Sequence, residues 1–267
     1  MQYRSIRTFL LVSASVFSIL IGFNPSMVQG HNYRAPAATT PQSNPTTPTE
    51  TAKFVYKALF EKRFRDAFNL SVFKLAIEGM SDVDFNELRP EFEAMAAESD
   101  KIEFTGEQIS GEQATVYAKV LDDKGNPQVA PIPFIRRNGT WIFGDDDTLA
   151  AVQKDGKNYF FNIRIQTHEE DAKKMFERIV KAQIVHASKN AGAFGDIRTL
   201  VTEELLPEDI LGTRSTGYKY SITIAKDGKS YTAAAEPERY GRTGKLSFYL
   251  ESSILNSKDN GGKPLKN

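Results

Sequence analysis

The strongest restriction on the fold comes from a change of hydrophobic period in the last third of the chain. From Thr167 to Asn190, one set of residues recurs at intervals of three and four, which predicts an amphipathic helix. This set is Ala172, Met175, Phe176, Ile179, Val180, Gln183 and Ile184. From residue 218 the period becomes two, over residues 218–224, 230–235 and 245–250, which predicts three strands. The region is therefore expected to form an α+β domain, with a long helix packed on an antiparallel meander.

Local signals predict where this helix begins and ends. Thr167 is placed to act as the N-cap, and Glu170, three residues later, completes a capping box. At the other end, Asn190 and then Gly192 are expected to stop the helix. Between the first two strands, Asp227-Gly228 indicates a tight hairpin.

Several short strings in this region give a resemblance to a known family. They are Ala182-Gln183, Gly217-Tyr218, Ala235-Glu-Pro237, Tyr240-Gly-Arg-Thr-Gly244 and Ser247-Phe248. With them, residues 167–254 resemble the soluble part of type IV pilins and type II secretion pseudopilins, in which a helical stem packs on an antiparallel sheet. A polymerising pilin requires a continuous apolar helix that leads into this stem. Here residues 158–165 and an extra domain precede the stem, so filament formation by the usual route is not expected.

The preceding region reads as helices first and strands afterwards. Thr47 is a predicted N-cap, with Pro48 at the first helical position and Glu50 reaching back. Ser81 is expected to cap a later helical segment, which Pro90 interrupts. Alternation then predicts four strands over residues 101–109, 113–121, 128–137 and 140–143.

This second pattern also gives a resemblance. The matching strings are Ala52 to Phe60, Asp66-Ala67, Ala114-Thr-Val116 and Asn138-Gly-Thr-Trp141. Residues 48–144 resemble the cone-shaped nuclear transport factor two-like fold, notably its small exported bacterial branch. The resemblance implies a sheet curled around a helix, with a pocket at the wide end. Enzymes of this superfamily usually place an aspartate or histidine base and a tyrosine in that pocket.

The chain of 267 residues is long enough for two cores. We expect a signal peptide at 1–30, a disordered Pro/Thr-rich tether at 31–47, a nuclear-transport-factor-two-like domain at 48–154, a pilin-like domain at 155–256 and a disordered tail at 257–267. Residues 149–165 are open between an extension of either domain and a hinge. The overall fold class is α+β.

Export is expected from the first residues. Arg4 and Arg7 precede an apolar core from Phe9 to Phe23, and Val28-Gln-Gly30 resembles a cleavage site. An uncleaved membrane anchor is the alternative. The chain contains no cysteine, so it can carry neither a disulfide nor a lipid on an N-terminal cysteine. The predicted location is periplasmic or extracellular, with no stable membrane insertion after cleavage.

The candidate ligand-binding residues are Tyr56 and Tyr117, two phenols that could line the pocket of the cone. Packing in the core, with a hydrogen-bonded hydroxyl, is the alternative for both. Glu103 and Glu107 could supply an inward carboxylate, but alternation alone does not decide which way they face. Residues 48–154 contain no histidine.

No catalytic residue, metal ligand or cofactor is predicted. His168-Glu-Glu-Asp171 does not converge on one point, because adjacent helical residues point about 100 degrees apart. His186 suits the end of the helix, where a cation complements the dipole. Gly144-Asp-Asp-Asp147 lacks the spacing of an EF-hand and reads as a turn, and Gly241-Arg-Thr-Gly244 reads as a loop between strands.

The charges balance, with 34 basic and 34 acidic residues, which argues against a general nucleic-acid or anionic-membrane surface. We therefore expect an exported bacterial binding or adaptor protein that engages a protein or a small-molecule ligand. One alternative is an isomerase or dehydratase with a buried acid beside Tyr56 or Tyr117. Another is a structural subunit of a pilus or secretion assembly, which would self-associate through the stem helix.

Overall fold

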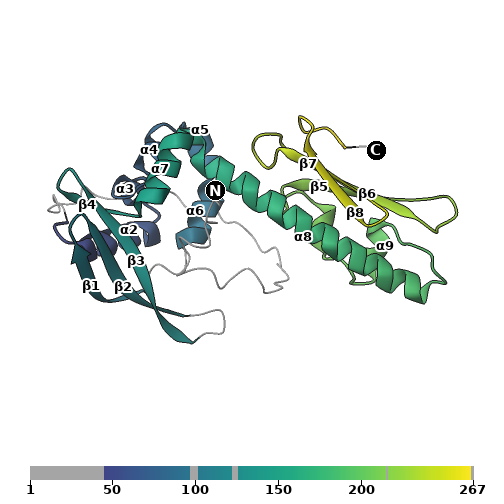
Figure 1. The fold of residues 1–267 in the computed structure, drawn as a ribbon, viewed down its shortest axis with the longest axis horizontal. Helices are drawn as coiled ribbons and strands as arrows, with labels where there is room; N and C mark the ends of the chain where they lie inside the picture. The colour runs from purple at the N-terminus through teal and green to yellow at the C-terminus, as the bar shows by residue number, and fades with distance from the viewer. Residues whose placement is uncertain (1–44, 97–101, 122–125, 215, 266–267) are drawn as a thin grey trace, which may run out of the picture. The chain divides into compact units, whose positions relative to one another are not determined.

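The computed structural model describes residues 45–96, 102–121, 126–214 and 216–265. The chain divides into two compact units, with the division between Lys157 and Asn158. Each unit combines helices with a four-stranded antiparallel sheet, which confirms the predicted α+β class (Figure 1). The predicted signal peptide and residues 31–44 of the predicted tether lie outside the described residues. In the described part of the chain, no helix has the length and apolar character needed to cross a membrane.

Unit 1 begins with a series of helices. They are α2 (Pro48–Phe60), α3 (Phe64–Asn69), α4 (Lys74–Glu78), α5 (Asp82–Glu87) and α6 (Arg89–Ala96). The capping box predicted for α2 is confirmed, because Thr47 Oγ1 accepts from Glu50 N and the Glu50 side chain accepts from Thr47 N. Ser81 caps α5, also as predicted. α5 ends with Leu88 as its C-cap, and α6 begins at Arg89. Pro90 therefore lies in the first turn of α6, where a backbone N–H would have no helical acceptor, so its missing N–H costs no helical hydrogen bond.

The sheet of unit 1 follows these helices. It contains β1 (Glu103–Ser110), β2 (Gln113–Leu121), β3 (Pro127–Arg137) and β4 (Thr140–Phe143), in that order, and α7 (Asp146–Asp155) comes next. The register pairs Val116 with Ile132 and Ala118 with Ala130, which places these side chains on one face. That face is buried together with Ala52 of α2 and forms the core of the unit.

Prolines protect an open edge of this sheet. β4 pairs with β3 only over Phe134–Arg137, so in the described part of the chain the first half of β3 is an edge. Pro133 O accepts from Gly144 N, which shows that odd-numbered residues of β3 direct their backbone groups away from β2. Pro127, Pro131 and Pro133 share that parity and have no N–H. This edge therefore offers few donors to an added strand.

Unit 2 is built on one long helix. α8 (Tyr159–Lys189) has 31 residues and is followed by α9 (Ile197–Thr202) and the 3-10 turn η3 (Glu208–Leu211). The sheet contains β5 (Tyr218–Ile224), β6 (Tyr231–Pro237), β7 (Leu246–Glu251) and β8 (Ile254–Asp259), in that order. The predicted Asp227-Gly228 hairpin joins β5 to β6, with Gly228 at a φ of 69°.

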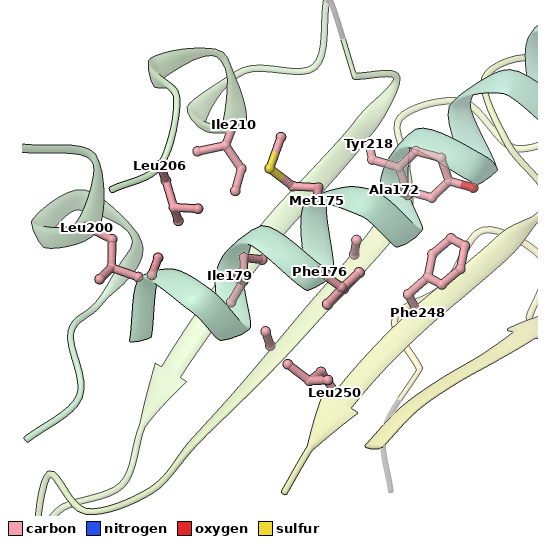
Figure 2. Close-up of a cluster of buried hydrophobic side chains, with 13 residues drawn as sticks. Ala172, Met175, Phe176, Ile179, Leu200, Leu206, Ile210, Tyr218, Phe248 and Leu250 are labelled. Atoms are coloured by element: carbon pink, nitrogen blue, oxygen red, sulfur yellow. The ribbon is translucent and has the colours of Figure 1, made fainter. Parts of the chain in front are cut away.

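The core of unit 2 lies between α8 and the sheet (Figure 2). The ring of Phe176 on α8 lies 5.9 Å from that of Phe248 on β7, and Tyr218 on β5 lies 5.6 Å from Phe248. All three side chains are almost completely buried. Leu200 and Ile210, which come from α9 and η3, add to the same cluster. Ala172, Met175, Phe176 and Ile179 of the predicted apolar face thus pack on the sheet, whereas Ile184 of the same set is 63% exposed.

The predicted start of the long helix is wrong. α8 begins at Tyr159, so Thr167 lies inside the helix and is not its N-cap. The residues before Thr167 include Phe160, Phe161 and Ile163, all buried. Burying several large apolar side chains outweighs the weak preference of a threonine for a helix end. The predicted end is confirmed, with Asn190 as C-cap and Gly192 at a φ of 78°.

The prediction of three strands in unit 2 is also wrong, because β8 adds a fourth. The turn between β7 and β8 uses Ser252 and Ser253 at φ values of 49° and 64°, without the glycine that usually marks such a hairpin. Residues 257–259 of the predicted tail belong to β8, and Ser247 Oγ donates to Lys263 O beyond it. The short, mostly polar sequence of β8 gave no alternation to detect.

Candidate functional site

An open groove with a volume of about 310 Å³ lies on unit 1. Its side chains come from the link between α2 and α3, from α3 itself, from α5 and from the start of α6. Four of its lining residues are cations, namely Lys62, Arg63, Arg65 and Arg89. The others are Phe64, Phe85, Asp66, Asp82 and Asn86.

The local fold brings the cations together over aromatic rings. Lys62 adopts a φ of 58° just after α2, which turns the chain sharply into α3. Phe64 and Phe85 are almost fully buried, so they form the apolar base of the groove. The guanidinium carbon of Arg65 lies 4.2 Å from the Phe85 ring centroid, and that of Arg89 lies 5.9 Å from the Phe64 centroid. Cation–π attraction favours both positions.

The cations differ in their acidic partners. Arg63 contacts Asp66 at 2.5 Å and Glu61 at 2.8 Å. Its hydrogen bond with Asp66, and to a smaller extent that with Glu61, raises the pKa of Arg63. Arg65 contacts Asp82 at 2.7 Å.

The remaining two cations are held loosely. Lys62 lies 3.4 Å from Glu93. Arg89 donates to Asn86 Oδ1 at 3.4 Å and pairs with no carboxylate among the described residues. Arg89 is therefore the guanidinium of the groove best placed to receive an added anion.

The two predicted ligand-binding residues lie outside this groove, with Tyr56 on α2 at one face of the sheet and Tyr117 on β2 at the other. Tyr56 packs against Phe104 and Phe143, with ring centroids 5.6 and 6.2 Å apart, and burial raises the pKa of its hydroxyl. Tyr117 lies on the other face of β2, and its hydroxyl donates to Gln108 Oε1 at 3.2 Å. The two phenols therefore do not line one common pocket. Their binding role stays a prediction.

The two candidate carboxylates have other partners. Glu103 forms an ion pair with Lys119 at 2.9 Å on the outer face of the sheet. Glu107 Oε2 accepts from Thr49 N at 2.8 Å and from Thr49 Oγ1 at 2.6 Å. Because Thr49 lies in the first turn of α2, Glu107 caps that helix from β1 and stabilises a free backbone N–H.

The segment from His168 to Asp171 holds a loop of unit 2. His168 Nδ1 lies 2.9 Å from Thr243 O. Glu169 Oε1 accepts from Lys245 N at 2.9 Å and from Leu246 N at 3.0 Å. These contacts fix the backbone that enters β7. Because α8 begins at Tyr159, the segment lies inside the helix. His186, in the last turn of α8, lies 2.8 Å from Glu203 Oε2.

The Gly144 to Asp147 segment begins a helix. Asp145 is the N-cap of α7 and accepts from Thr148 N at 2.7 Å, and Asp146 pairs with Arg137. The Gly241 to Gly244 segment forms a turn between β6 and β7, as predicted, in which Arg239 N donates to Thr243 Oγ1. No group of three or more His, Cys, Asp and Glu side chains is arranged to hold a metal ion in the ranges that the structure describes.

The strings that carry the pilin resemblance make contacts inside unit 2. Gln183 Nε2 donates to Gly195 O at 2.7 Å, and Gly195 N donates to Gln183 Oε1 at 3.0 Å. Tyr218 Oη donates to Leu246 O at 2.9 Å. Gly244 lies against Tyr218, where an added Cβ would stand 2.2 Å from the hydroxyl oxygen. These residues therefore have a structural explanation.

No sequence pattern predicted the groove. The segment Lys62-Arg63-Phe64-Arg65 carried a signal for its first residues, because it places three cations around a phenylalanine. Arg89 lies far along the chain and gave no such signal, since only the packing of α6 against the first helices brings it near.

No protein-family model matches the chain, and no curated protein matches it. A weak structural neighbour is a crystal structure from Campylobacter jejuni, described as an NTF2-like transpeptidase. It shares 18% sequence identity with this chain, covers 36% of this chain and 95% of its own, and has a TM-score of 0.26. At that TM-score the match carries no argument about fold or activity.

Proposed function

We propose that this chain is an exported bacterial binding or adaptor protein of the cell envelope or exterior, and that unit 1 binds its ligand in the groove. The observation that carries the proposal is the position of Arg89, which lacks a carboxylate partner in the described part of the chain and lies over an aromatic base. Six of the nine lining residues are charged, so the groove suits a charged or polar group of a ligand. The volume of about 310 Å³ suits one or two side chains better than a large cofactor.

Binding without catalysis is supported by the packing between α2 and the sheet. An isomerase or dehydratase of the cone type would hold its substrate in that space. Tyr56, Phe104, Phe143 and Phe134 fill it with ring contacts of 5.6 to 6.2 Å. The carboxylates considered as bases are engaged in an ion pair and a helix cap.

The two resemblances complete the proposal. Unit 1 is proposed to be a nuclear-transport-factor-two-like domain, supported by helices that precede a meander and by α2 packed on the sheet. Unit 2 is proposed to be pilin-like, supported by α8 packed on a meander and by the internal contacts of Gln183 and Tyr218. Export rests on Arg4, Arg7 and the apolar core that follows them.

Native mass spectrometry of the protein isolated from its source tests the proposal. We expect the wild type to retain a small molecule or a polypeptide that is released on unfolding. Asn86→Trp should abolish this retention, because Asn86 is exposed and lines the groove, which the indole would fill. Val83→Trp is the matched control, since Val83 lies on the same helix, is 78% exposed and does not line the groove.

Two results would contradict this function. One is a wild type that carries no bound molecule when isolated gently. The other is an Asn86→Trp variant that retains the same molecules as the wild type.

A further inference from the structure

The four cations of the groove differ in how fully acidic groups of the protein already balance their charge. Arg63 is held by two carboxylates. Arg65 donates to Asp82 Oδ1 at 2.7 Å and, through Nη1, to Ile77 O at 3.5 Å. These two guanidiniums have their charge balanced within the protein, and an incoming anion would have to displace a partner.

Arg89 and Lys62 remain. Arg89 has one long contact, to a neutral amide oxygen, so most of its five N–H donors have no protein acceptor among the described residues. Lys62 has a single 3.4 Å contact, and its side chain is 61% exposed. An ammonium on a flexible stem can move to meet a bound anion at little cost.

We propose that Arg89, assisted by Lys62, binds a carboxylate in the groove, and that this carboxylate belongs to an acidic side chain of a partner polypeptide. This inference rests on the proposed binding function of unit 1. A guanidinium presents N–H donors in a fork that matches the two oxygens of a carboxylate. The buried Phe64 ring against Arg89 makes one side of the contact apolar, which strengthens the charged hydrogen bonds.

The lining residues favour a carboxylate over a phosphate. Asp66 and Asp82 stand among the four cations, and Asp82 is 91% exposed. A phosphate ester has three charged oxygens and a carboxylate has two, while the guanidiniums of Arg63 and Arg65 are already engaged by carboxylates, so the single fork of Arg89 matches a carboxylate in full. The groove is also open to solvent rather than enclosed, which suits a side chain that enters from a polypeptide lying on the surface.

Fluorescence anisotropy on the full chain tests this inference. The probe is a short labelled glycine-serine peptide that contains two glutamates and an amidated C-terminus. Its comparison peptide has glutamines in their place. We expect the glutamate peptide to bind more tightly, and Arg89→Gln to weaken its binding by about tenfold or more, the range expected for a lost charged hydrogen-bond pair.

Two further variants control for charge and folding. Arg89→Lys should bind with intermediate affinity, because it keeps the charge and loses the fork. Lys74→Gln should bind like the wild type, since Lys74 pairs with Glu78 on α4 and does not line the groove. Equal thermal midpoints for Arg89→Gln and Arg89→Lys would exclude a folding defect as the cause of any difference between them.

The outcomes separate the inference from the proposed function. Equal binding of the glutamate and glutamine peptides, unaffected by Arg89→Gln, would overturn the carboxylate inference and leave the binding function standing. Stronger competition by inorganic phosphate than by the unlabelled glutamate peptide would also overturn it. Competition by free glutarate as strong as by that peptide would overturn the polypeptide part. The function itself fails only by the mass spectrometry results, namely a wild type without a bound molecule or an Asn86→Trp variant that retains the same molecules as the wild type.

Discussion

The two units share a plan, a helix on a four-stranded meander, but they attach the helix in opposite ways. In unit 1 the sheet supplies the polar contact, since Glu107 of β1 caps α2 at Thr49. In unit 2 the helix supplies it, because Glu169 of α8 accepts two backbone N–H groups at the start of β7. Gln183 of α8 also binds a loop backbone, because its side chain pairs with both the N–H and the C=O of Gly195.

Single glycines of the two units differ in the space around them. In unit 2 an added Cβ at Gly217 would lie 2.2 Å from His168 Nδ1, and one at Gly244 would lie 2.2 Å from Tyr218 Oη. In the sheet of unit 1, Gly106 has open space around it. Crowding is not confined to unit 2, because an added Cβ at Gly144 of unit 1 would lie 2.5 Å from Val72 Cγ2.

The largest effect is expected from deleting a buried ring of unit 2. Phe248→Ala should lower the free energy of unfolding of unit 2 by about 3–5 kcal/mol, because Phe248 is fully buried between Phe176 and Tyr218. Hydrogen exchange should show lost protection in β5 to β8 and unchanged protection in β2 and β3. Equal loss in both sheets would mean that the units unfold together.

The next effect compares two glycines. Gly244→Ala should cost about 3 kcal/mol, because its Cβ would collide with the fully buried Tyr218. Gly106→Ala in β1 should change stability by less than about 0.5 kcal/mol. Urea denaturation of both variants measures this. A similar cost for the two changes would remove the contrast between the units.

A smaller effect is expected at the polar contact of α8. Gln183→Leu should cost about 2 kcal/mol, since it leaves the N–H and C=O of Gly195 without their buried partner. Gln166→Leu on the same helix should be near neutral, because its contact with Glu170 is exposed. Thermal denaturation compares the two. A neutral Gln183→Leu would show that water replaces the side chain.

The smallest effect concerns acid. Hydrogen bonds from the Thr46 backbone, with smaller contributions from Thr46 Oγ1 and the Thr47 backbone, lower the pKa of Glu50 in unit 1, and a bond from Thr199 N lowers that of Asp196 in unit 2. Because the folded pKa lies below the unfolded value, the stabilisation is present above the ordinary pKa values of 4.5 and 3.8 and is lost as the pH falls through the lowered ones.

Melting temperatures between neutral and acidic pH measure this loss. Glu50→Gln should weaken the acid dependence of unit 1, and Asp196→Asn that of unit 2, while each keeps an oxygen that can accept the cap hydrogen bond. An unchanged acid dependence in both variants would assign it to other carboxylates.

Sequence patterns predicted the elements that carry their own local signal. β2 and β4 have the predicted bounds, and the caps at Thr47 and Ser81 are where they were expected. They failed where a tertiary contact outweighed a local preference, as at Thr167, which the buried residues before it draw into α8. For the candidate site, alternation could not decide whether Glu103 and Glu107 on β1 face inward.

The sequence by itself determined the fold class, the order of the elements other than α7 and β8, and part of each core, because hydrophobic period and capping act over a few neighbouring residues. Only the tertiary structure decided that Arg89 lies beside Lys62 and Arg65, and that Glu107 caps a helix from a distant strand. Both depend on how separate elements pack. A pattern along the chain does not show which polar groups find a partner when those elements pack.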